Sequence, residues 1–68
     1  MTVGQKIRQL RRRRGLSQEA LALELGTVHP RAVSNWEIGK HEPSFRAVRA
    51  LCRYFGISLN EFLKGVDD

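Results

Sequence analysis

The residues best suited to molecular recognition lie in the stretch HPRAVSNWE, at positions 29–37. Arg31, Ser34 and Asn35 are side-chain types that hydrogen-bond to the edges of DNA bases: arginine to guanine, asparagine to adenine and serine to several bases. In a helix each residue advances about 100° around the axis, so these three residues would share one side with Pro30. The opposite side would carry the apolar residues Ala32, Val33 and Trp36. The pattern predicts a helix with one core face and one face of donors and acceptors, although a solvated face without a ligand has the same pattern.

The elements that must position this surface are two consecutive helices. Pro30 lacks a backbone N–H and is favoured at the first helical position, so we expect a recognition helix over about 30–37. Ser17 is a good N-cap and Gly26 a good C-terminal stop, which predicts a preceding helix over about 18–25. Two helices joined by a short turn form a helix-turn-helix, whose second helix enters the major groove in DNA-binding proteins.

Three further helices are expected, each between a capping residue and a glycine. The pairs that would bound them are Thr2 with Gly15, Ser44 with Gly56, and Ser58 with Gly65. Apolar residues recur at helical spacing in the segment after Ser44, at Phe45, Val48, Leu51, Cys52 and Phe55. Core positions, and not base stacking, are expected for the aromatic residues Trp36, Phe45, Phe55 and Phe62. Because no segment alternates with a period of two, we predict an all-α fold, a compact five-helix bundle that forms one domain over 1–68.

Length and composition limit the number of domains, the cysteine chemistry, the cellular location and the class of partner. Sixty-eight residues are enough for one domain only, and the single cysteine, Cys52, excludes an intrachain disulfide. We expect Cys52 to be a small buried hydrophobe, and we expect no metal site and no cofactor. The sequence has no membrane-spanning run and no signal-peptide core, so we expect a soluble, cytoplasmic protein. The net charge of +5 favours polyanionic partners, with nucleic acid first and anionic lipid second.

The stretches LSQEALALELG and AVSNWEIGKHEPS resemble the phage repressor and Cro-like class of helix-turn-helix proteins, the XRE family, over roughly Ile7 to Leu63. The resemblance implies a lambda-repressor-like bundle whose recognition helix lies in the major groove of double-stranded DNA. It implies base reading by Arg31 and Asn35, with Ser34 and Pro30 beside them. It implies phosphate contacts from Gln18, Lys40 and Ser44, and places His29, as the N-cap, near a phosphate. The turn GTVHP is one residue longer than is usual in the family, and we expect Val28 to be its buried residue.

Four consecutive arginines, at positions 11–14, cannot form one surface, because successive helical residues point in different directions. Arg11 and Arg14 should face inward, whereas Arg12 and Arg13 should face outward and attract DNA at long range. The family resemblance pairs Arg11 with Glu37, as a structural ion pair that orients the recognition helix. A second arginine stripe, expected to be a solvated face, comprises Arg46, Arg49 and Arg53.

The sequence therefore predicts a transcriptional regulator, a bacterial or phage repressor that binds its site on double-stranded DNA as a homodimer. The surface between the two copies is expected at the last helix and its flanks, including Ile57 and Leu59, although both residues fit core positions equally well. The main alternative is an antitoxin-type module in which Leu23 and the last helix dock a protein partner, with DNA binding for autoregulation. Binding of nucleic acid or anionic membranes by charge alone is a third hypothesis. An enzyme is the least expected, because His29 and His41 lack a catalytic constellation.

Overall fold

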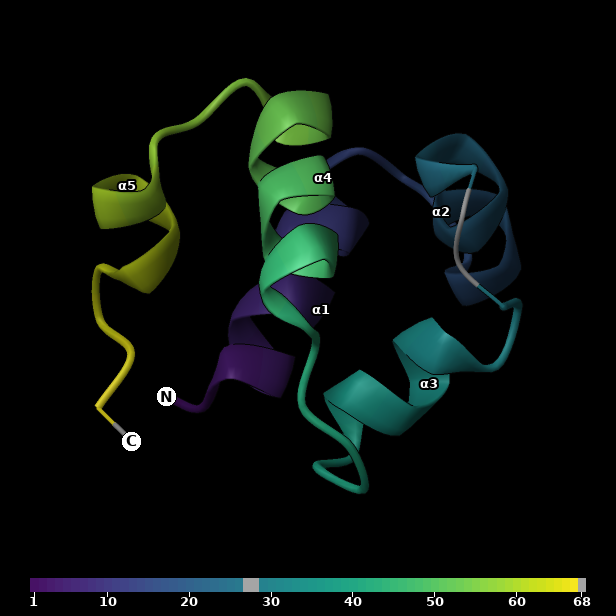
Figure 1. Ribbon diagram of the computed structural model, residues 1–68, viewed down its shortest axis with the longest axis horizontal. Coiled ribbons are helices and arrows are strands. Elements are labelled where there is room, and N and C mark those ends of the chain that lie inside the picture. Colours follow the sequence, from purple (N-terminus) through teal and green to yellow (C-terminus); the bar gives the residue numbers. More distant parts are fainter. Residues whose placement is uncertain (27–28, 68) are drawn as a thin grey trace.

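The computed structural model describes residues 1–26 and 29–67, and within them every regular element is a helix. The five helices are α1 (Val3–Arg13), α2 (Gln18–Leu25), α3 (Ala32–Glu37), α4 (Phe45–Phe55) and α5 (Leu59–Leu63). Figure 1 shows α4 in the centre, with α1 behind it, α5 on one side and α2 and α3 on the other. The all-α prediction is confirmed.

Side-chain caps fix where most of the helices begin. The Thr2 hydroxyl accepts from the Gln5 backbone N–H at 3.1 Å, and the Gln5 side chain accepts from the Thr2 N–H at 2.8 Å, which closes a capping box. Ser58 and Glu61 close a second box at the start of α5. Ser17 and Ser44 cap α2 and α4 by accepting from Ala20 and Ala47. Because each cap satisfies an amide that no helical bond reaches, these starts are set by local sequence.

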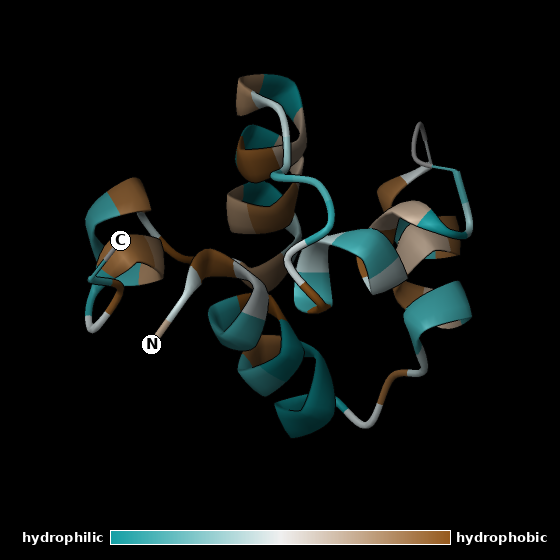
Figure 2. Ribbon diagram, turned by 90° about the horizontal axis from the view of Figure 1, so that it is seen from below, coloured by the Kyte–Doolittle hydropathy of each residue, from teal (hydrophilic) through white to brown (hydrophobic). Residues whose placement is uncertain are grey.

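The core lies where the five helices meet. Figure 2 shows apolar residues along the inner sides of the helices and hydrophilic residues over the last turn of α1, where its arginines lie. The buried apolar side chains are Ile7, Leu10, Leu21, Ala22, Val33, Trp36, Ala47, Leu51, Phe55 and Phe62. Cys52 is half-buried against this cluster, and its burial raises the pKa of its thiol.

The prediction that Phe45 belongs to the core is wrong, since 72% of this residue is exposed. The buried stripe of α4 runs through Ala47, Leu51 and Phe55. Phe45 lies about 120° around the axis from Leu51, at the open end of the helix. Phe45 follows the apolar spacing of α4, but its direction around the helix axis places it outside the core.

The two chain ends are joined on one side of the bundle (Figure 1). The Met1 amino group donates to the Gly65 carbonyl at 2.9 Å and forms an ion pair with Asp67 at 3.3 Å. Lys6 donates to the Lys64 carbonyl at 2.9 Å, so α1 and the end of α5 are also linked by a side chain. In the part of the chain that the structure describes, no helix is long and apolar enough to cross a membrane.

Candidate nucleic-acid interface

The side of α3 opposite its buried residues carries four side chains, of which two are exposed and two, Ser34 and Asn35, are half-buried. Asn35 N–H donates to Arg31 C=O at 3.0 Å and Ile38 N–H donates to Ser34 C=O at 3.1 Å, so each pair is stacked one helical turn apart. We call these four residues, Arg31, Ser34, Asn35 and Ile38, the outer face of α3. They follow the spacing i, i+3, i+4 and i+7, which keeps them in one stripe. None of the four side chains makes a hydrogen bond with another described residue.

The start of α3 differs from the prediction that it begins at Pro30. The helix begins at Ala32, and Pro30 and Arg31 form a turn closed by a 2.9 Å hydrogen bond from Ala32 N–H to His29 C=O. The expectation that His29 is the N-cap is wrong, because Arg31 occupies that position; the His29 Nδ1 instead accepts from the Arg31 N–H at 3.1 Å. Pro30 therefore lies in the turn that precedes α3 and not in the first turn of the helix. The expectation that Val28 is buried falls on residues outside those the structure describes.

The inner side of α3 anchors the outer face to the bundle. Val33 and Trp36 are buried in the core. Gly4, in the first turn of α1, lies directly against the backbone at the end of α3, where an added Cβ would collide with the Trp36 carbonyl oxygen. A side chain at this position would push α1 and α3 apart, so glycine permits their close approach.

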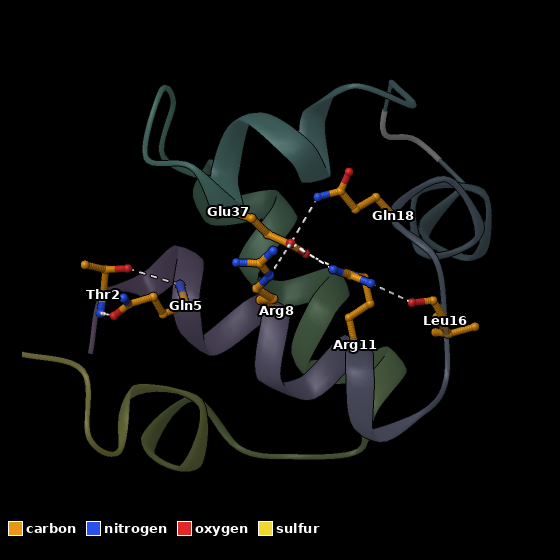
Figure 3. A network of polar contacts seen from close by, with 7 residues as sticks. All are labelled: Thr2, Gln5, Arg8, Arg11, Leu16, Gln18 and Glu37. Atoms are coloured by element: carbon orange, nitrogen blue, oxygen red, sulfur yellow. Dashed lines mark hydrogen bonds and ion pairs between the residues drawn. The ribbon is translucent and has the colours of Figure 1, made fainter.

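Glu37, the last residue of α3, connects three helices through its carboxylate (Figure 3). Arg11 in α1 donates to it twice, from Nε at 2.7 Å and from Nη2 at 3.0 Å. Gln18, the first residue of α2, donates to it at 3.0 Å, and Arg8 lies 3.7 Å away. The Glu37 side chain is only 2% exposed, so these donors replace the water that the carboxylate has lost. This is the pair that the family resemblance predicts between Arg11 and Glu37, enlarged to a network.

The network keeps both partners charged. Burial raises the pKa of the Glu37 carboxyl, but hydrogen bonds from Arg11 and Gln18 and the charges of Arg11 and Arg8 outweigh it, so this pKa lies below its ordinary value. The hydrogen bond to Glu37 raises the pKa of Arg11, against the opposing effect of burial. A third N–H of Arg11 donates to the Leu16 carbonyl at 2.8 Å, which fixes the chain between α1 and α2.

The four residues expected near phosphates differ in how much donor capacity they have left. The Gln18 amide nitrogen gives one hydrogen to Glu37 and retains a second. The Ser44 hydroxyl accepts from Ala47 as the cap of α4 and can still donate. Lys40 and His29 are both exposed, and Lys40 follows directly after Gly39, whose φ of +79° turns the chain at the end of α3.

The arginine run divides as the helical geometry predicts at three of its four positions. Arg11 is buried in the network and Arg12 and Arg13 are exposed, but Arg14, expected to face inward, is exposed as well. Arg14 crosses to the end of α4, where it donates to the Phe55 carbonyl at 3.2 Å and lies over the rings of Tyr54 and Phe55. It thus interacts with the negative end of the α4 dipole and has a structural role.

Three important positions were missed from the sequence. Gly4 had a signal, because a glycine inside a helix that caps nothing suggests a close approach. Arg8 lies one turn before Arg12 and gave no sign that it would approach Glu37. Ile38 lies on the outer face of α3, and the helical wheel could have found it had the expected helix been extended by one residue.

A short helix followed by a second helix, with a buried apolar side and a polar outer side, defines the chain as a helix-turn-helix domain. The family model described as helix-turn-helix matches residues 7–62, which is most of the chain. The chain therefore belongs to the XRE-type helix-turn-helix family of DNA-binding transcription regulators, which confirms the resemblance found in the sequence. It is 35% identical over 65 residues to the HTH-type transcriptional activator BcrR of Enterococcus faecalis. That match covers 96% of this chain but 31% of the relative, so the chain spans less than a third of the relative's length.

Proposed function

We propose that this domain binds double-stranded DNA in a sequence-specific manner and regulates transcription by occupying its site. The observation that carries the proposal is the outer face of α3, a stripe on an anchored helix in which Arg31 is exposed and Ser34 and Asn35 are half-buried. Their side chains have donors and acceptors that can hydrogen-bond to base edges and that make no hydrogen bond with another described residue. Arg31 and Asn35 would read bases, with Ser34 and Pro30 beside them.

Phosphate contacts would surround this reading surface. Lys40 follows the recognition helix, and Gln18 lies at the start of α2 with a free amide hydrogen. Ser44 and His29 are the other two candidates. Such contacts set the position of a protein on the duplex but carry no sequence information. Removing any one of them should lower affinity for all duplexes alike.

The experiment is a selection of bound sites from random duplexes, followed by affinity measurements on the selected and a scrambled duplex at several salt concentrations. A sequence-specific domain should prefer the selected duplex at every salt concentration, because the electrostatic contribution is the same for both. Equal affinities would reject the proposal in favour of binding by charge alone.

The expected direction of regulation is repression, since a protein that occupies a promoter blocks it without a further contact. The relative BcrR is named an activator, which makes the direction a separate question. A promoter placed beside the selected site, transcribed with and without the protein, answers it. A decrease in transcript supports repression, and an increase supports activation.

We further propose that two copies bind one approximately two-fold site. Ile57, expected at the surface between copies, packs against the core, so it is a weak candidate. Leu59 is 46% exposed and lines a shallow hollow of about 260 Å³ with Phe45 and two arginines, Arg49 and Arg53. The arginines would repel each other in a symmetric pair, so pairing should depend on DNA to offset their charge. Sedimentation should therefore give a monomer alone and a two-to-one complex on the selected duplex, and a one-to-one complex at saturation would contradict this.

A protein-interaction role is the second candidate, and Leu23 is the observation in its favour. This residue is 79% exposed on α2, the largest exposed fraction among the large apolar residues that the structure describes. An antitoxin-type role predicts a partner protein that co-purifies with the wild type and is lost in Leu23→Ser. Retention of the partner by Leu23→Ser would exclude a Leu23 contact.

A further inference from the structure

Ile38 is the one apolar member of the outer face of α3. It is 71% exposed, although its backbone is still helical and its N–H bonds to Ser34. Single exposed aliphatic residues are common on protein surfaces, so exposure alone says little. The position is what matters, because Ile38 completes the stripe that begins at Arg31 and ends where Gly39 turns the chain away.

The other exposed apolar residues do not explain Ile38. The apolar hollow beside α4 is lined by residues of α4 and by Leu59, and Ile38 is not among them. Leu23 belongs to α2 and lies outside the α3 stripe. Ile38 is therefore an isolated apolar group among side chains that carry hydrogen-bonding groups.

The chemistry of the major groove offers one matching group. An isoleucine has no donor or acceptor, so placing it against a phosphate or a polar base edge would remove water from that group without replacing it. The C5 methyl of thymine is the apolar group that base pairs present in the major groove. Contact between Ile38 and this methyl would bury apolar surface on both sides.

We propose that Ile38 is a specificity-determining residue that contacts the C5 methyl of a thymine. This inference rests on the proposed function, because it requires that α3 read the major groove. It assigns to the end of α3 a preference for an A·T base pair in a defined orientation, with the thymine methyl toward Ile38. The three polar residues of the outer face would read the neighbouring base pairs.

The test couples a change in the protein to the removal of one methyl group from the DNA. Each thymine of the selected duplex is replaced in turn by deoxyuridine, which pairs identically but lacks the C5 methyl. At one position, we expect the wild type to lose affinity about three- to tenfold, the size expected for the loss of a small buried apolar contact. Ile38→Ala should lose a similar factor on the thymine duplex and show no further loss on the deoxyuridine duplex.

Leu23→Ala is the matched control, since it also shortens an exposed aliphatic residue. It should bind the thymine duplex like the wild type and keep the full loss on deoxyuridine. Thermal unfolding of Ile38→Ala should match the wild type, because the residue lies outside the core.

The outcomes separate this inference from the proposed function. If a preferred site exists but Ile38→Ala weakens all duplexes equally, or couples to no thymine, the methyl contact is wrong and specific binding stands. If no preferred site is recovered, both the proposed function and the Ile38 assignment fail.

Discussion

Arg11 in α1 and Glu37 at the end of α3, 26 residues apart in the chain, are joined by two hydrogen bonds of 2.7 and 3.0 Å. The carboxylate is almost fully buried, and it also accepts a hydrogen bond from the side-chain amide of Gln18. α3 is therefore held in place by a buried ion pair, and removal of either partner would leave the charge of the other without compensation.

The first prediction concerns the energetic coupling of this pair. Arg11→Met keeps part of the side-chain stem but leaves the Glu37 charge buried, and Glu37→Gln leaves Arg11 without its anion. Each change should lower the free energy of unfolding by about 1–3 kcal/mol. The double variant should lose less free energy of unfolding than the sum of the two single losses, because neither charge is then left buried without its partner. Urea unfolding of the four proteins measures the coupling, and strictly additive costs would contradict it.

The second prediction concerns stability in acid. The folded-state pKa of Glu37 lies below its ordinary value of 4.5, so the unfolded chain takes up a proton first as the pH falls. The stabilisation is complete above about pH 5 and is lost progressively as the pH falls through the folded-state pKa. Glu37→Gln should be less stable at neutral pH and should lose less stability on acidification. Thermal melting between pH 3 and pH 7 tests this. Glu24→Gln, a substitution at an exposed residue, is the control, and it should retain the wild-type dependence of melting temperature on pH.

The third prediction concerns Gly4. Helix propensity alone says that Gly4→Ala should stabilise the protein, by up to about 1 kcal/mol. The Trp36 carbonyl leaves no room for a Cβ, so we expect the opposite sign, a loss of about 1–3 kcal/mol from overpacking. Denaturant unfolding gives the sign directly. A Gly4→Ala protein as stable as the wild type would show that α1 and α3 are less closely packed than described.

The fourth prediction separates base reading from electrostatic attraction. Arg31→Ala should cost about 1–3 kcal/mol on the preferred duplex, flatten the preference at one or two positions, and change nonspecific affinity much less. Joint replacement of Arg12 and Arg13 by alanine should weaken binding to every sequence and reduce the salt dependence. Lys40→Ala should behave like the joint replacement of Arg12 and Arg13. The assignment of α3 fails if Arg31→Ala lowers both affinities equally while Arg12 and Arg13 set the preference.

The features that could be predicted from the sequence are those that a short segment decides by itself. Caps at Thr2, Ser17, Ser44 and Ser58 determine four of the helix starts locally, whereas α3 has no side-chain cap and starts two residues after the predicted Pro30. The apolar period placed most of the core. It failed at Phe45 because the angle of the buried stripe is set by neighbouring helices, which the period does not contain.

The candidate site divides in the same way. The outward direction of Arg31, Ser34 and Asn35 follows from helical geometry within one segment, whereas the fit of Gly4 against α3 depends on two segments meeting in space. Gln18 is instructive, because the resemblance assigned it to phosphate while the structure directs one of its hydrogens to Glu37. The pairing of Arg11 with Glu37 was accessible only through the family resemblance, since nothing local links two residues in different helices.

The outer face of α3 has an evolutionary consequence. Its four side chains make no hydrogen bond with the other described residues, whereas Val33, Trp36 and Glu37 on the same helix hold it in place. Arg31 and Ile38 are exposed, and exposed positions tolerate substitution with little change in stability, commonly within about 0.5 kcal/mol. Mutations could therefore redirect such a domain to new operators while its folding is preserved, so that related chains with the same core would diverge in the genes that they control.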